Sequence, residues 1–381
     1  MSRLDDAKLQ NERVDRLTHL VRDPLPFDVV SSADMERLRR EWLKRDSIPC
    51  LVPGRNSGAN HAWPGLDVRT LLSGDNSGGR ISAHDIIIAP GAGLPAHYQQ
   101  SSDMYLFVME GEVELTIGHL PETSRRESFA YAPSETTTAW RNNGAEPARL
   151  YVLYSPAGPD RAFAEAHQVW ERSHAVSQEA YLGVLERYEF CFDAKGALKN
   201  DSRTNLSWQR MEASVDSFED FSSMRERWAK RLPTPKLIHE TSRCPSIVLP
   251  DGVRSSVIVS GDESGGRAVF FFSALEPGYT AGAHYQPSEE ELFFVVDGEL
   301  ELTCGSETRR VGRGAFGFAP RGATHGFKSP EGAKTRILTL NSPAGHERGF
   351  EMIMAHSGEP MAQFIQRLSA HGWQLHDHPL T

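Results

Sequence analysis

The chain of 381 residues carries 51 acidic and 41 basic side chains, which gives a formal net charge of −10. This balance and a sequence pI near 5.9 argue against nucleic acid as a partner, and the length predicts about two domains. The four cysteines form no C-x-x-C pair, and neither a signal segment nor a bilayer-length apolar run is present, so we expect a cytoplasmic protein with no membrane contact.

Helical patterns flank two regions of short strands. Residues 34–45 carry apolar side chains at helical spacing after a start at Ser31 or Ser32, and residues 224–231 echo them. Residues 160–187 and 346–371 are also helical in pattern, whereas residues 192–215 are polar and typical of a linker. We therefore divide the chain into an N-terminal helical segment, a first β domain with its trailing helix, a linker with a helix, and a second β domain with its trailing helix: 1–47, 48–191, 192–233 and 234–381.

An internal repeat with a constant offset of 187 residues, from Ser73 to Ser260, relates the two halves. The octapeptide at 73–80 recurs at 260–267 with one change, and Ala-His-Tyr-Gln occurs in both halves, at 96–99 and 283–286. Nearly half of the positions aligned in this way are identical between 73–118 and 260–305. The sequence therefore predicts a duplicated, mainly β domain with flanking α-helices.

Candidate metal ligands gather in one hairpin of the second half. His284 and Gln286 lie two residues apart on a predicted strand, so their side chains point the same way. After a Pro-Ser turn, Glu291 opens a second strand, and His325 follows a Pro/Gly turn further along the chain. These residues offer two imidazoles, one carboxylate and one amide oxygen. The neighbouring Glu290 is the rival carboxylate, and we expect it to face solvent at the turn.

The spacing of these residues resembles that of the cupin superfamily, whose two motifs are similar to G-x5-H-x-H-x3or4-E-x6-G and G-x5-P-x-G-x2-H. Five residues separate Gly278 from His284, six separate Glu291 from Gly298, and the second motif is matched by Gly314, Pro320, Gly322 and His325. Gln286 departs from the pattern, because the family usually has a second His there. The resemblance implies two tandem cupin barrels, which are jelly-roll-like double-stranded β-helices, with flanking α-helices.

The two halves differ at the ligand positions. With the offset of 187, the four candidates correspond to His97, Gln99, Met104 and Thr138. A thioether and a hydroxyl are poor replacements for a carboxylate and an imidazole, so we expect a degenerate, metal-free site in the first barrel. His97 would then be a packed or hydrogen-bonded remnant. The alternative is an organic ligand bound beside Trp140.

The ligand set predicts one divalent metal ion per chain, held in the second barrel. Two imidazoles and a carboxylate with open positions suit non-haem Fe(II), while Mn, Ni and Zn are also admissible. Phe293, Val295 and Phe327 alternate onto the inward face of their strands, where they would either line a substrate pocket with apolar surface or belong to the plain core of the barrel. We therefore expect a dioxygenase, an oxidoreductase acting with dioxygen on a small aromatic or apolar substrate.

Two other functions stay open. The first is a non-oxidative, metal-assisted isomerase, lyase or decarboxylase, with Glu291 or a nearby Glu as general base. The second is a cupin module that binds a small molecule without transforming it. The resemblance implies relatives that act on phenolic and flavonoid compounds and others that degrade oxalate. Oxygen consumption that depends on ferrous iron would distinguish the first expectation from these two. We also expect a homo-oligomer.

Overall fold

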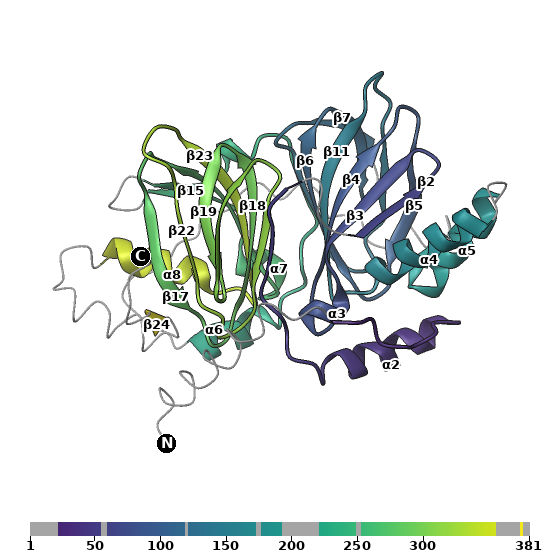
Figure 1. The fold of residues 1–381 in the computed structure, drawn as a ribbon, viewed down its shortest axis with the longest axis horizontal. Coiled ribbons are helices and arrows are strands. Elements are labelled where there is room, and N and C mark those ends of the chain that lie inside the picture. The colour runs from purple at the N-terminus through teal and green to yellow at the C-terminus, as the bar shows by residue number, and fades with distance from the viewer. Residues whose placement is uncertain are drawn as a thin grey trace.

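The computed structural model describes residues 22–54, 59–118, 121–172, 177–192, 221–248, 253–355 and 374–375. Two antiparallel β-barrels lie side by side, the first in purple to blue and the second in green to yellow in Figure 1. Each barrel combines a seven-stranded sheet with a five-stranded sheet. The mainly β, two-barrel fold expected from the sequence is thereby confirmed.

The first barrel is built mostly from the N-terminal half of the chain. Its seven-stranded sheet has the order β13-β9-β6-β11-β4-β3-β2, with bounds Lys236–Ile238, Phe129–Ala132, Asp103–Glu110, Ala148–Ser155, Ser82–Ile88, Leu66–Leu72 and Ala59–Trp63. Its five-stranded sheet has the order β12-β5-β10-β7-β8, with bounds Phe190–Cys191, Gly93–Gln99, Thr138–Arg141, Glu112–Ile117 and Pro121–Arg125.

The second barrel repeats this architecture. Its seven-stranded sheet has the order β1-β21-β18-β23-β16-β15-β14, with bounds Cys50–Val52, Phe316–Ala319, Glu290–Asp297, Thr335–Ser342, Val269–Leu275, Arg254–Val259 and Ser246–Val248. Its five-stranded sheet has the order β20-β19-β22-β17-β24, with bounds Glu307–Gly312, Glu299–Cys304, His325–Lys328, Thr280–Tyr285 and Gln374–Leu375.

The two barrels exchange one short strand each. Strand β1 comes from the first half of the chain but pairs with β21 of the second barrel, through Cys50 opposite Phe318. Strand β13 comes from the second half but pairs with β9 of the first barrel, through Lys236 opposite Tyr131. The division at residues 48 and 234 did not anticipate this exchange, which ties the barrels together through backbone hydrogen bonds.

Helices flank the barrels where the sequence places them. Ser31 begins α2 (Ser32–Trp42) through a capping box with Asp34, and the helix buries Met35, Leu38 and Trp42. The expected helix over 160–187 is two helices, α4 (Pro159–Arg172) and α5 (Gln178–Arg187). The remaining helical elements are α3 (Gly74–Ser77), α6 (Phe221–Trp228), η1 (Thr241–Arg243), α7 (Gly261–Ser264) and α8 (His346–Ala355). Most of the expected linker, and the helical pattern beyond residue 355, lie outside the described residues.

The repeated Ser-Gly-Asp sequence packs against the helix that precedes each barrel, α2 in the first half and α6 in the second. Gly261 begins α7 against the Trp228 ring, and a Cβ at this position would lie 2.4 Å from that ring. Gly74 lies in the same way against Trp42. A glycine is needed here because any larger residue would push the indole away from the barrel.

Strand β18 separates two apolar cores. Leu292, Phe294 and Val296 belong to the core between the two barrels, where they meet aromatic residues of the first barrel such as Tyr151. Phe293 and Val295 belong instead to the interior of the second barrel. Alternating side chains along one strand therefore hold the barrels together and fill the second barrel.

Among the described helices, none is long and apolar enough to cross a membrane.

Candidate metal centre

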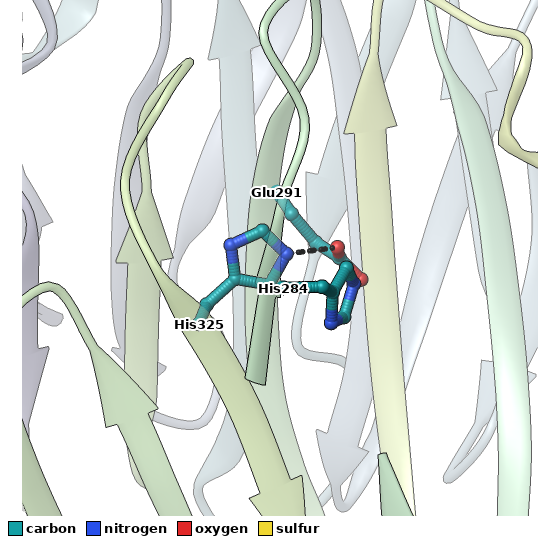
Figure 2. A group of neighbouring side chains, drawn as sticks. All are labelled: His284, Glu291 and His325. Carbon is teal, nitrogen blue, oxygen red and sulfur yellow. Dashed lines mark ion pairs between the residues drawn. The ribbon is translucent and has the colours of Figure 1, made fainter. Parts of the chain in front are cut away.

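Three of the predicted ligands converge inside the second barrel. His284 comes from β17, Glu291 from β18 and His325 from β22, and one ligand atom of each lies within 4.8 Å of the others. Figure 2 shows the two imidazoles next to the carboxylate, with His325 Nε2 placed 3.1 Å from Glu291 Oε2. The two rings are 4.4 Å apart between centroids, and their residues are paired directly across β17 and β22. Cross-strand pairing therefore brings together residues far apart in the sequence.

Backbone carbonyls orient both imidazoles. His284 Nδ1 lies 2.8 Å from the carbonyl oxygen of Gly282, and His325 Nδ1 lies 2.9 Å from that of Ala323. A carbonyl oxygen only accepts hydrogen bonds, so Nδ1 must donate in each case. The Nε2 atom of each neutral ring then carries a lone pair. Histidine ligands of metal ions are commonly held in this way.

The electrostatics give these groups the protonation states that a metal needs. Burial lowers the pKa of His284 to about 3, and the neighbouring His325 adds to this effect. Burial would raise the pKa of Glu291, but the hydrogen bond from His325 and the charge of His346 outweigh it and lower the pKa to about 2. At neutral pH, Glu291 is therefore ionised and His284 is neutral.

Gln286 lies beside the triad, with its amide buried. Its Nε2 is 3.4 Å from Glu291 Oε2 and 3.5 Å from His346 Nδ1. The amide Oε1 is also buried and has no hydrogen-bond partner among the described residues. Because the O and N atoms of an amide exchange places by a simple flip, the oxygen can also face the triad. Ligation by Gln286 stays a prediction.

A second layer of polar side chains, which the sequence did not predict, lies next to this triad. His346, the first residue of α8, is only 4% exposed, and its Nδ1 lies 3.1 Å from Asn341 Nδ2 and 3.5 Å from Glu289 Oε2. Burial would lower the pKa of His346, but Glu289 and Glu291 outweigh it and raise the pKa. One sequence signal indicated His346: the Ser-Pro-Ala-Gly segment occurs in both halves, and it is followed by His346 in the second half but by Pro159 in the first.

The expectation that Glu290 faces solvent is wrong. Its side chain is 1% exposed and forms ion pairs with Arg80 Nε at 3.0 Å and with Arg321 Nε at 3.3 Å. Burial raises the pKa of Glu290 to about 7, although Arg321 and Arg80 act in the opposite direction. Glu289 is buried too and pairs with Arg225. The three consecutive glutamates are thus all inside the protein, and each has different partners.

The predicted substrate-pocket residues line one side of the triad. Phe293 lies 5.9 Å from the His325 ring, and Phe327 lies 5.8 Å from Phe293. Phe293 and Val295 are fully buried core residues, while Phe327 is partly buried and also contacts Tyr279 at 6.0 Å. Phe293 thus packs beside a candidate ligand as part of the barrel core, and contact of these residues with a substrate stays a prediction.

At the corresponding site of the first barrel, His97 contacts a hydroxyl and two aromatic rings. His97 has the same Nδ1 contact, 2.8 Å from the Pro95 carbonyl oxygen, but its Nε2 lies 3.2 Å from the Thr138 hydroxyl. The rings of Phe190 and Phe192 pack on His97 at 5.3 and 5.6 Å. The other positions, Met104, Gln99 and the nearby Trp140, are buried as well. Among the described residues, the His-Glu-His group of the second barrel has no counterpart here.

Comparison with known families gives two matches to one domain type. The model described as cupin domain matches residues 84–154 and 271–341, one match in each barrel. The matched segments run from β4 to β11 and from β16 to β23, so they include His284, Glu291 and His325 in the second barrel.

Two proteins from Streptomyces match over a quarter of this chain or less. An uncharacterized protein of Streptomyces coelicolor, SCO3923, is 34% identical over 70 residues, which is 18% of this chain and 65% of the relative. Polyketide synthase CurC of Streptomyces cyaneus is 29% identical over 96 residues, covering 25% of this chain and 62% of the relative. The chain thus spans less than two thirds of the length of either protein. A structure of Bacillus subtilis oxalate decarboxylase, described with Mn(II) centres, has a TM-score of 0.50 and 13% identity over 85% of each chain, which is a likeness of fold.

Proposed function

Because the chain belongs to the cupin superfamily and carries two cupin domains in tandem, we propose that its second barrel is a metal-dependent enzyme site. His284, Glu291 and His325 would bind one divalent ion, with Gln286 as a fourth, weaker ligand. The substrate would be a small organic molecule. The first barrel would carry no ion.

One observation supports this proposal most strongly. His325 Nε2 and Glu291 Oε2 lie 3.1 Å apart, yet the contact of His325 Nδ1 with Ala323 leaves Nε2 as an acceptor in the neutral ring. Two buried acceptors at this distance repel each other unless a cation lies between them. A proton on His325 would join this pair alone, whereas a divalent ion could be held by His284, Glu291 and His325 together.

The donor set favours an oxygenase. Two imidazoles and one carboxylate with open positions suit Fe(II), which when bound supplies one-electron chemistry and a binding position for dioxygen. The apolar side chains of Phe293 and Phe327 favour an aromatic or otherwise apolar substrate. The partial match to a polyketide synthase component makes phenolic, polyketide-type compounds the first substrates to test.

The polar second layer favours a second candidate. His346, Glu289 and Asn341 are buried close to the triad, and such groups can accept or donate protons during a non-oxidative isomerase, lyase or decarboxylase reaction. Manganese is a suitable ion for this chemistry and prefers the same kinds of ligand. In this case Glu289 and His346 would hold the proton, and the metal would orient the substrate.

Oxygen uptake and product analysis distinguish the two candidates. Protein loaded with Fe(II) and separately with Mn(II) is incubated with a panel of phenolic and carboxylic compounds, with and without dioxygen. An oxygenase consumes dioxygen only with Fe(II) and substrate together, while product formed without dioxygen supports the non-oxidative candidate. The His325→Ala variant is the inactive control and His97→Ala the matched control in the first barrel. Equal turnover in His325→Ala and wild type would contradict both candidates.

A further inference from the structure

Two arginines cross the boundary between the barrels in opposite directions. Arg80 of the first half pairs with Glu290 of the second barrel, and Arg267 of the second half pairs with Asp103 of the first barrel at 2.5 Å. The offset of 187 residues relates both the two arginines and the two acids. The duplication has therefore produced a reciprocal pair of ion pairs. Each acid directly precedes a ligand position, Met104 in the first barrel and Glu291 in the second.

Glu290 connects the two strands that carry Glu291 and His325. Its carboxylate also pairs with Arg321, in the loop that leads into β22. That loop is held further by Gly322, whose N–H donates to the Gln286 carbonyl oxygen at 2.9 Å. The carbonyl of Ala323, in the same loop, accepts the Nδ1 proton of His325. A displaced Glu290 would thus disturb both the backbone of Glu291 and the loop that orients His325.

Arg80 is held in place by the first barrel. Its Nη1 donates to Ser47 Oγ at 2.6 Å and to the Ser77 carbonyl oxygen at 3.2 Å. Its carbonyl oxygen accepts from Ser155 Oγ at 3.1 Å. The guanidinium therefore reaches Glu290 from a fixed position. A flexible surface side chain would lose more conformational entropy in forming the same ion pair.

We infer that Arg80 is a positioning residue for the metal centre, so that the metal-free barrel completes the site of its neighbour. This inference rests on the proposed metal binding by Glu291 and His325. Among the described residues, loss of Arg80 would leave the buried carboxylate of Glu290 with one cationic partner, Arg321, which is 39% exposed. A buried carboxylate with too few partners moves toward water, and this movement loosens the two ligand strands.

The mirror-image ion pair supplies a matched control. Asp103 stands in the first barrel at the position that Glu290 occupies in the second. It also accepts hydrogen bonds from the Ser134 N–H at 2.9 Å and from the Tyr131 hydroxyl at 3.2 Å. Its neighbour Met104 stands where the second barrel has its carboxylate ligand. Removing Arg267 therefore breaks a similar interface contact without disturbing any candidate ligand.

The test compares Arg80→Met, Arg267→Met and Arg80→Lys with wild type by Mn(II) titration, using the electron paramagnetic resonance signal of free Mn(II), and by thermal unfolding. We expect both methionine variants to lower the unfolding temperature, because each breaks one interface ion pair. Only Arg80→Met should weaken Mn(II) binding, by about tenfold or more, with a change in the spectrum of the bound ion. Arg80→Lys should recover part of the affinity, since the charge is kept.

The outcomes separate this inference from the proposed function. Equal Mn(II) affinity in Arg80→Met and wild type, or equal weakening in Arg80→Met and Arg267→Met, would overturn the positioning role while leaving the metal site intact. If Arg80→Met does not fold, Arg80→Gln replaces it, because this variant keeps a hydrogen-bond donor but removes the charge, and unchanged affinity and spectrum in Arg80→Gln would also overturn the role. Absence of binding of both Mn(II) and Fe(II) by wild type would refute the metal centre itself.

Discussion

The Nε2 atom of His97 lies 3.2 Å from the hydroxyl of Thr138, at the position where the second barrel has two imidazoles around a carboxylate. The hydroxyl can donate its proton to Nε2, so the lone pair of His97 is satisfied inside the first barrel. His325 Nε2 lies instead beside Glu291, which has no proton to give at neutral pH. The first barrel thus pairs its histidine with a hydroxyl, whereas the second barrel places two imidazoles around a carboxylate, a group that could hold a metal ion.

Substitution of Glu290 and of Glu291 should show which of the two carboxylates binds the metal and which one only holds the neighbouring residues in place. Glu291→Gln should remove most bound metal, because a neutral amide is a weak ligand and Glu291 is the carboxylate that, among the described residues, groups with the two imidazoles. Glu290→Gln should keep the metal and weaken its binding several-fold, since an amide oxygen can still accept from Arg80 and Arg321. Metal content after dialysis measures both. Metal loss in Glu290→Gln, with full occupancy in Glu291→Gln, would show that Glu290 is the ligand and that the assignment to Glu291 is wrong.

Gln286→His should raise the metal affinity. The amide of Gln286 already lies 3.4 Å from Glu291, and an imidazole from the same backbone position would restore the ligand that the family usually has. Competition against a chelator of known affinity measures the change, with Gln99→His, the same substitution in the first barrel, as the control. Weaker binding in Gln286→His would show that this side chain supports the ligands from outside the coordination sphere.

The stability of the first barrel should fall in acid. Burial lowers the pKa of His84 to about 3 and that of His97 to about 4. Both values lie below the ordinary 6.5, so the unfolded chain binds more protons between about pH 6.5 and pH 3, and stability decreases as the pH falls through this window. Each such group contributes a slope of up to roughly 1.4 kcal/mol per pH unit.

A single substitution tests this origin of acid sensitivity. The second half has Phe271 where the first has His84, so His84→Phe should fit the barrel and make the urea-unfolding free energy less dependent on pH between 6 and 4. Substitution of the exposed His239 by Gln is the control. An unchanged pH slope in His84→Phe would mean that other groups cause the acid sensitivity.

The sequence was sufficient to predict the fold and the convergence of His284, Glu291 and His325. Two signals carried this prediction: the spacing of the motif and the alternation of side chains along the strand after Glu291. Phe293 and Phe294 lie on opposite faces of β18, one in the barrel interior and one between the barrels, as a period of two requires. Both signals are local, and the structure preserves them.

The features that the sequence did not reveal depend on contacts between the halves. Glu290 looks like a solvated turn residue until Arg80, from the other barrel, is placed against it. The exchanged strands β1 and β13 are three residues long, and so short a run carries no signal about its partner. His346 is hidden in a helical pattern, because only the fold shows that the first turn of α8 lies against Gln286 and Asn341.

Metal stoichiometry tests the central claim most directly. Protein purified without chelator and without an affinity tag is equilibrated with Fe(II) or Mn(II), and bound metal per chain is measured for wild type, His284→Ala, His325→Ala and His97→Ala. We predict about one ion per chain in wild type and in His97→Ala, and loss of most metal in the two second-barrel variants, because one imidazole and the oxygen ligands hold a transition ion poorly. Two ions per chain, or full occupancy in His284→Ala or His325→Ala, would contradict the account.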